Sequence, residues 1–223
     1  MKITKFVPAL FVCTFALVVG AVAFAETTTD KTKETTKTTA TAPTGDAAHQ
    51  AMMAEMAKYA MPGKEHEMLK SMEGKWKATV KMWAGGPEPQ VSEGTTDNEM
   101  EFGGRVLESQ FKGEMMGTKF TGLNLMGFDN KKKEYWSFWT DDMSTSAMMT
   151  TGPASPDGKT ITMKGMMDGM DGKPTEHVLT TRIVDANNHT FTMAANMGGK
   201  MTTMMEITYT RSGSSQSAAG TDK

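Results

Sequence analysis

The sequence predicts a single, mainly β domain: an antiparallel β-barrel of about ten strands with short N-terminal helices. Two observations lead to this fold class. Between residues 73 and 211, apolar and polar residues alternate with the period of two that is typical of half-buried strands. Turn residues, mostly Gly, Asp, Asn and Pro, interrupt the alternation at short intervals. Strands joined by tight turns favour a meander, and closing it into a barrel removes exposed edges.

The first predicted strand is the clearest. Trp76, Ala78, Val80 and Met82 alternate with lysine and threonine residues, so that one face is apolar. Further β-type runs cover residues 93–102, 104–112, 118–128, 133–141, 144–152, 159–167, 174–185, 188–196 and 200–211. The turns recur but the strand sequences do not, so the chain is not a tandem repeat.

Short helices are expected before the barrel, within residues 46–72. Asp46 is a candidate N-cap, and Pro62-Gly63 separates two segments. Each segment carries apolar residues at helical spacing: Met52, Met53, Met56 and Ala60 in the first, and Met68, Leu69 and Met72 in the second. Because such short helices are marginal alone, both are expected to pack against something larger.

Residues 1–25 read as a secretory signal peptide. Lys2 and Lys5 precede an apolar run, and Ala23-Phe24-Ala25 is a small-x-small cleavage pattern. A retained membrane anchor is the alternative, but the apolar run is short for a span of about 20 residues. The protein is therefore expected to be exported, periplasmic or extracellular, with no membrane span after cleavage.

Two segments are too polar to fold. Residues 26–45 are mostly Thr, Lys and Ala, and residues 212–223 are similarly poor in large apolar side chains. Neither segment buries enough surface to offset the entropy of ordering, so we expect a disordered linker and a disordered tail. The predicted folded unit comprises the helices at 46–72 and the barrel at 73–211.

The composition excludes several classes of function. The formal net charge is −2, with both signs interspersed, whereas nucleic-acid binding needs a clustered basic surface. The only cysteine, Cys13, lies in the predicted signal, and Val12 before it disfavours a lipoprotein signal. A mature chain without a thiol has no disulfides, zinc–cysteine sites or cysteine catalysis.

A methionine-rich stretch at residues 163–172 has two interpretations. Thioethers are ligands for Cu(I), and Met163, Met166, Met167 and Met170 could converge there, with His177 or His189 adding an imidazole. However, the chain has 24 methionines, which favours methionine as an adaptable core residue. Adjacent methionines in a strand also point to opposite faces. The core interpretation is preferred, and no metal ligands are assigned.

No catalytic constellation is recognisable. His66-Glu67 begins like a zinc-protease helix, but Lys70 stands where the second histidine must be. Asp141-Asp142 lies near serine and threonine hydroxyls, a combination that more often makes a turn. The four histidines lack ligand spacing. We therefore expect no enzyme and no cofactor.

One predicted strand is apolar on both faces. Tyr135, Ser137 and Trp139 share one face, and Trp136 and Phe138 share the other. Such a strand is covered on both sides or has one face lining an enclosed cavity. If the barrel is hollow, the candidate ligand-lining residues are Trp76, Met82, Phe120, Tyr135, Trp139, Met148 and Met163. Arg182 is a possible counter-ion, a cap over a tryptophan or a solvent-facing residue.

Several motifs resemble known families. Leu69-x-x-Met72-x-Gly74-x-Trp76 resembles the first-strand signature of the calycins, which include lipocalins, fatty-acid-binding proteins and nitrobindin-like barrels. From residue 65 to residue 211 the chain resembles the bacterial domain-of-unknown-function family 1579, through motifs such as Gly103-Gly104-Arg105, Gly127-Phe128-Asp129-Asn130, Trp139-x-Asp141 and Met205-Glu206-Ile207-x-Tyr209. The resemblance implies one calycin-like barrel without established activity or catalytic residues. Haem-binding relatives use a histidine ligand, and no histidine here matches that role.

The first functional hypothesis is an exported barrel that binds a small apolar or amphipathic molecule inside, by burial of apolar ligand surface. Copper(I) handling by methionine and a filled structural or interaction barrel without a ligand are the alternatives. Fold does not decide among them.

Overall fold

A computed structural model describes residues 45–213 except for residues 84, 116 and 170–171. The described residues belong to one compact unit, Pro43–Lys223. The predicted signal peptide at 1–25, nearly all of the predicted linker and most of the predicted tail lie outside the described residues.

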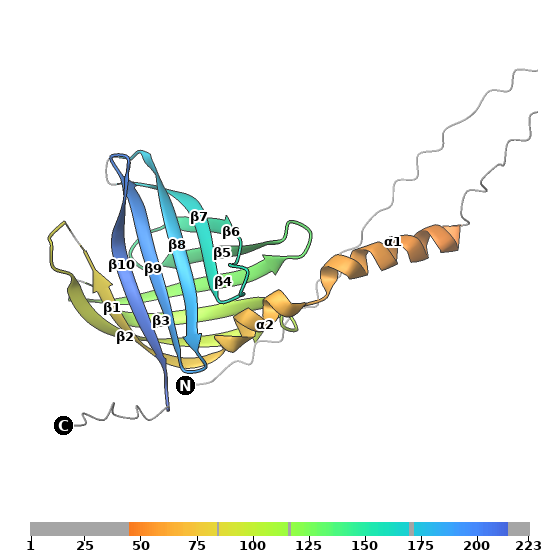
Figure 1. The fold of residues 1–223 in the computed structure, drawn as a ribbon, viewed down its shortest axis with the longest axis horizontal. Coiled ribbons are helices and arrows are strands. Elements are labelled where there is room, and N and C mark those ends of the chain that lie inside the picture. The colour runs from red at the N-terminus through yellow and green to blue at the C-terminus, as the bar shows by residue number, and fades with distance from the viewer. Residues whose placement is uncertain (1–44, 84, 116, 170–171, 214–223) are drawn as a thin grey trace, which may run out of the picture. The chain divides into compact units, whose positions relative to one another are not determined.

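The described chain forms a closed antiparallel barrel of ten strands, which confirms the predicted fold class (Figure 1). Every strand pairs with its neighbour in sequence, and β1 pairs with β10 to close the wall. The strands are β1 (Gly74–Met82), β2 (Gln90–Glu101), β3 (Val106–Met115), β4 (Thr118–Asp129), β5 (Glu134–Asp141), β6 (Ala147–Gly152), β7 (Thr160–Asp168), β8 (Pro174–Asp185), β9 (Asn188–Met197) and β10 (Lys200–Arg211).

Two helices precede the barrel, α1 (Gly45–Ala60) and α2 (Lys64–Ser71). The second helix packs as expected, because His66, Met68 and Leu69 are buried. The expectation that the first helix also packs is wrong, since α1 contains no buried residue. Its apolar stripe is open to solvent, with Met53 half exposed at 50%.

The barrel interior follows from the two-residue alternation. On β1, for example, Trp76, Ala78 and Val80 are buried while the lysine and threonine residues between them are exposed. The buried apolar residues form two clusters, one beneath α2 and one nearer the opposite end of the barrel. We call the barrel end over which α2 packs the covered end, and the end where β1 finishes at Met82 the far end.

The seam between β6 and β7 differs from the others. The ladder contains one registered pair, Thr151 with Lys164, whereas β7 and β8 share nine. The two strands approach closely at this seam. A Cβ on Gly152 would collide with the carbonyl oxygen of Thr162, and a Cβ on Gly165 would collide with the carbonyl oxygen of Met149. Glycine is needed at both positions for this close approach.

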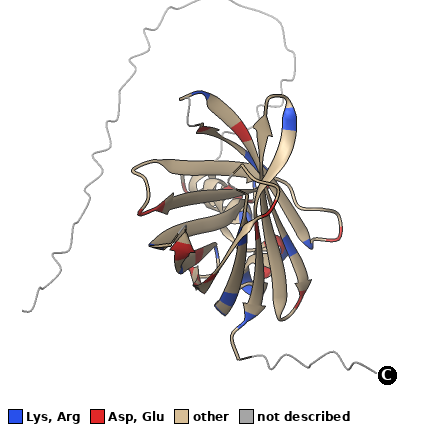
Figure 2. Cartoon of the chain, turned by 90° about the vertical axis from the view of Figure 1, so that its left-hand side faces the viewer, with Lys and Arg blue, Asp and Glu red and all other residues tan. Residues whose placement is uncertain are grey.

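Charged residues are spread over the barrel wall. Figure 2 shows lysine and arginine interspersed with aspartate and glutamate on the visible strands. Arg182, whose role the sequence left open, is exposed on β8. Within the described residues, no helix has both the length and the apolar character needed to cross a bilayer.

Candidate functional site

The covered end is filled by α2. Leu69 is completely buried, and with Met68 and Met72 it packs against inward-facing barrel residues: Leu107, Met126, Tyr135, Ile161 and Met163. Main-chain carbonyls of this segment accept side-chain hydrogen bonds from the wall. Tyr135 Oη donates to the carbonyl of Glu65 at 2.9 Å, and Trp76 Nε1 donates to that of Met72 at 2.8 Å. Burial, and secondarily the charge of Glu65, raises the pKa of Tyr135 to about 12, so the phenol remains a donor.

An aromatic stack lies beside α2 where β1, β9 and β10 meet. The His189 ring packs parallel to Tyr209 with centroids 4.4 Å apart, and edge-on to Trp76 at 4.3 Å. Its Nδ1 is buried without a hydrogen-bond partner in the described structure. Burial, with a smaller effect of Arg211, lowers the pKa of His189 to about 4, so the imidazole is neutral at physiological pH.

The far end has a different lining. Phe120 and Trp139 stack with ring centroids 6.1 Å apart, and Phe111 packs on Phe120 at 5.9 Å. Trp139 lies across Gly122, where a Cβ would collide with its indole ring. The indole Nε1 donates to Asp141 Oδ2 at 2.8 Å, so the ring is held at the end of β5. Buried Phe111 and Phe120 and half-buried Trp139 therefore face the interior where no described helix covers the barrel.

Methionines continue this lining on the opposite wall. Met82, Met205 and Met193 are consecutive cross-strand partners on β1, β10 and β9. Directly paired residues on neighbouring antiparallel strands share a face and stand about 5 Å apart. All three side chains are half-buried, and they share the inner face with buried Ile207 and Val80. Three thioethers therefore stand side by side inside the far end.

A small cavity opens beside this row. Its volume is about 100 Å³, and its lining includes Met82, Gln90, Ser92, Glu114 and Met115. Half-buried Met82 and Met115 line it together with exposed Gln90 and Glu114. A larger cavity, of about 230 Å³, lies at the rim of the covered end, near the junction of α1 and α2.

The seven candidate lining residues are divided between the two ends. Trp76, Tyr135 and Met163 belong to the covered end, where Tyr135 and Met163 pack beneath α2 and Trp76 bonds to it. Met82, Phe120, Trp139 and Met148 lie at the far end, where Met148 is the cross-strand partner of Trp139.

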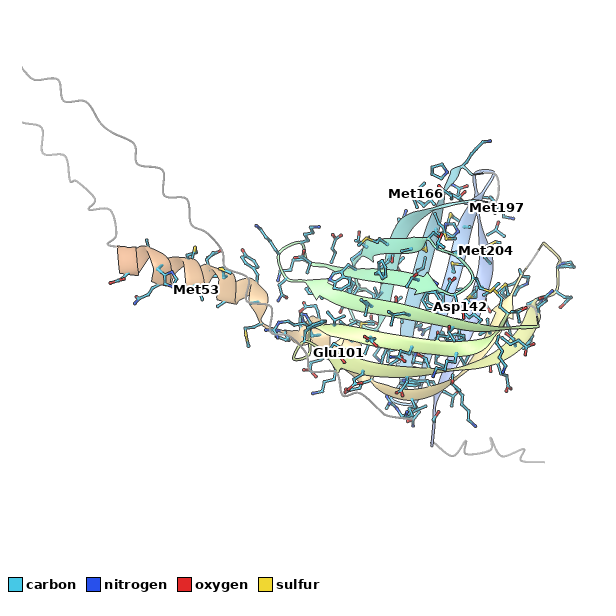
Figure 3. All side chains as sticks on the ribbon, turned by 180° about the vertical axis from the view of Figure 1, so that it is seen from behind. Met53, Glu101, Asp142, Met166, Met197 and Met204 are labelled. Atoms are coloured by element: carbon cyan, nitrogen blue, oxygen red, sulfur yellow. The ribbon has the colours of Figure 1, made fainter. Side chains whose placement is uncertain are left out.

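The methionines of the 163–172 stretch do not share one face. Met163 is buried inside the barrel, whereas Met166 is 57% exposed on the outer face. Figure 3 shows Met166 and Met197 at the strand ends away from α2. Met167 is on the same face of β7 as Met163. Met170 lies outside the described residues. The two candidate imidazoles are also apart. His177 pairs with Ala195 on β9, and Ala195 is six residues along that strand from His189, which lies in the covered end.

The catalytic fragments considered from sequence have structural roles. Asp142 accepts hydrogen bonds from the main-chain N–H and the hydroxyl of Thr121, and these bonds lower its pKa. Asp141 accepts from the N–H groups of Met143 and Ser144, which makes the turn between β5 and β6. In the described part of the chain, histidine and acidic side chains form no group of three that could hold a metal ion.

The comparisons with known proteins agree with this architecture. The model of a family described as "Protein of unknown function (DUF1579)" matches residues 61–211. The chain belongs to the DUF1579 family. The match covers α2 and the whole barrel and leaves out α1. A comparison with curated proteins finds no match.

The chain is similar to several solved structures, one of which shows the same fold. The crystal structure of Rv2717c from M. tuberculosis is 10% identical to this chain and aligns with a TM-score of 0.50, covering 68% of this chain and 99% of Rv2717c. A redesigned β-barrel is 11% identical with a TM-score of 0.35, over 65% of this chain and 94% of its own. At this identity, the likeness to Rv2717c shows a common fold alone.

Sequence reasoning does not identify the roles of two residues. Arg105 belongs to one of the motifs that resemble the DUF1579 family, and Arg211 is the last residue of the final strand. The signal for Arg105 was its place directly after Gly103-Gly104, both of which have positive φ. This turn directs the arginine toward α1, where its Nε donates to the carbonyl of Ala60 at 2.9 Å.

Proposed function

We propose that this protein is exported and binds a small apolar or amphipathic molecule at the far end of its barrel. The observation that carries the proposal is the difference between the two ends. At the covered end, α2 occupies the interior and its carbonyls accept hydrogen bonds from the wall. At the far end, half-buried Trp139 and Met82 face inward where no described helix covers them.

Methionine makes this end adaptable. The far-end cavity of about 100 Å³ is smaller than the roughly 300–1,000 Å³ of typical ligand pockets. Met82 and Met115 line it, and the unbranched thioether side chain rearranges readily to fit different apolar shapes. Entry of a ligand would displace these side chains, bury apolar surface and leave Gln90, the cross-strand partner of Met82, to orient a polar head group.

Titration with the neutral fluorophore N-phenyl-1-naphthylamine tests this proposal. We expect saturable binding at one site per chain and loss of that binding in Trp139→Ala. Phe138→Ala is the matched control, because Phe138 is the next residue on β5 and its partners Leu125 and Met149 are on the outer face. Absence of binding by the full chain, or an equal loss in both variants, contradicts the proposal.

The methionine row supports a second candidate, Cu(I) binding. Met82, Met205 and Met193 bring three soft ligands together from three strands. Titration with Ag(I), a redox-inert analogue of Cu(I), distinguishes this candidate from ligand binding. Binding that is lost in Met205→Leu and retained in Met166→Leu favours the metal, since Met166 is exposed on the outer face.

A further inference from the structure

A cleft lies at the rim of the covered end and is separate from the far-end site. It has a volume of about 230 Å³. Tyr59 from the end of α1 and His66 from α2 form one side, and Arg105, Phe128, Asn130 and Trp136 from the barrel form the other. Asn130 Nδ2 donates to the carbonyls of Tyr59 at 3.0 Å and Met61 at 2.8 Å, which fixes the junction between the helices.

Arg105 is a positioned cation within this cleft. Its Nε donates to the carbonyl of Ala60 at 2.9 Å and its Nη1 to that of Phe102 at 2.8 Å. Main-chain carbonyls hold the guanidinium, and across the described ranges no carboxylate forms a salt bridge with it. Nη2 donates no hydrogen bond to any described residue. A fixed guanidinium with one unused edge is a good donor for a carboxylate.

His66 adds a second donor. The main-chain N–H of Gly63 donates to His66 Nδ1 at 3.0 Å, so the neutral ring carries its proton on Nε2. Burial is the main reason that the pKa of His66 is lowered; Glu65 opposes this effect and Arg105 adds to it. The ring therefore offers an N–H to the cleft without bringing a second full charge.

The remaining walls are aromatic. Phe128 packs edge-on against His66 with ring centroids 6.0 Å apart and against Tyr135 at 4.9 Å. Trp136 lies flat over Gly127, where any Cβ would collide with the indole. Rings on several sides favour a flat, unsaturated ligand over a tetrahedral oxyanion such as phosphate.

We propose that this cleft binds a small planar carboxylate with an aromatic body. Arg105 Nη2 and His66 Nε2 would donate to the carboxylate oxygens, and Phe128 and Trp136 would contact the ring. The carboxylate of Glu65 repels an anion and weakens binding, but it is not part of the cleft lining. The site takes an anion at the covered end, whereas the far-end site takes a neutral apolar molecule.

Benzoate and its neutral analogue benzamide test the proposal on the full chain by titration calorimetry. We expect benzoate to bind and benzamide to bind at least tenfold more weakly, about the value of one hydrogen bond to a charged group. Arg105→Gln should weaken benzoate binding about ten- to a hundred-fold. Arg182→Gln is the matched control, because it removes one positive charge from an exposed strand position.

A second measurement uses the unmodified chain, so that its result does not depend on whether Arg105→Gln unfolds locally. In the unmodified chain, benzoate should raise the pKa of His66, followed through the ring proton signals by NMR. Equal binding of benzoate and benzamide, undiminished binding in Arg105→Gln, or a His66 pKa that benzoate does not move would each overturn the proposal.

Discussion

The guanidinium of Arg211 lies over the ring of Trp76, with 4.0 Å between its central carbon and the ring centroid. The same side chain donates from Nη1 to the carbonyl of Glu73 at 2.7 Å and from Nη2 to that of Ser71 at 2.9 Å. Trp76 is on the first strand and Arg211 ends the last. One side chain therefore connects both edges of the closing seam to the end of α2.

Replacing Arg211 by alanine should lower the free energy of unfolding by about 2–4 kcal/mol, because a cation–π contact and several hydrogen bonds are lost together. Urea denaturation followed by tryptophan fluorescence measures this change. Arg182→Ala is the control and should stay within about 0.5 kcal/mol, since that side chain is exposed. Similar values for the two variants would mean that Arg211 does not stabilise the seam.

Stability should fall in mild acid because of His189. Its pKa is lowered from the ordinary 6.5 to about 4, so between these values the unfolded chain binds the proton more readily than the folded one. The stabilisation is complete above pH 6.5 and is lost as pH falls toward 4, by roughly 3 kcal/mol at most.

Urea unfolding at pH 7 and pH 4.5 tests this pH dependence. Between pH 7 and pH 4.5, His189→Phe should lose less stability than the natural chain. His49→Gln, on exposed α1, should lose as much as the natural chain. Some dependence should remain from His66, whose pKa is also lowered. An unchanged pH dependence in His189→Phe would show that the buried imidazole does not cause it.

The two helices should differ sharply in their response to truncation. Leu69→Ala removes a completely buried side chain from α2 and should cost about 2–5 kcal/mol. Met53→Ala removes a half-exposed side chain from α1 and should change stability by less than about 0.5 kcal/mol. Thermal unfolding compares the two, and a large loss in Met53→Ala would show that α1 packs against a partner surface.

Gly152→Ala should destabilise the barrel by about 3 kcal/mol or more, because its Cβ would collide with the rigid main chain of β7 rather than a flexible side chain. Gly86→Ala is the matched control: the nearest atom to its Cβ would be 3.9 Å away. Chemical denaturation measures both, and a neutral Gly152→Ala would indicate that β6 and β7 separate easily.

The strands were predictable because burial in a barrel follows the local period of the sequence. The alternation around Trp76 and Ile161 identifies the inner face without knowledge of the neighbours. The same rule assigned Met163 and Met166 to opposite faces, and the structure places one inside and the other in solvent. Turn glycines such as Gly103 were equally clear from sequence.

Contacts between distant segments were not predictable. The environment of His189 depends on the register that places Trp76 and Tyr209 beside it, and nothing near residue 189 in the sequence specifies this register. The cleft at Arg105 forms only because the last residue of α1, Ala60, lies against the turn that follows β2 and accepts a hydrogen bond from Arg105. The methionine stripe of α1 follows the periodicity of a packed helix, and only the structure shows that nothing in the described chain covers it.

The single registered pair between β6 and β7 has a dynamic consequence. Backbone amides of a strand exchange with solvent when their ladder bonds open, and a seam with few such bonds opens at a lower free-energy cost than the rest of the fold. In heavy water we expect amide protons of Ala147–Gly152 to be replaced by deuterium before those of β9, which is bonded along its length on both sides.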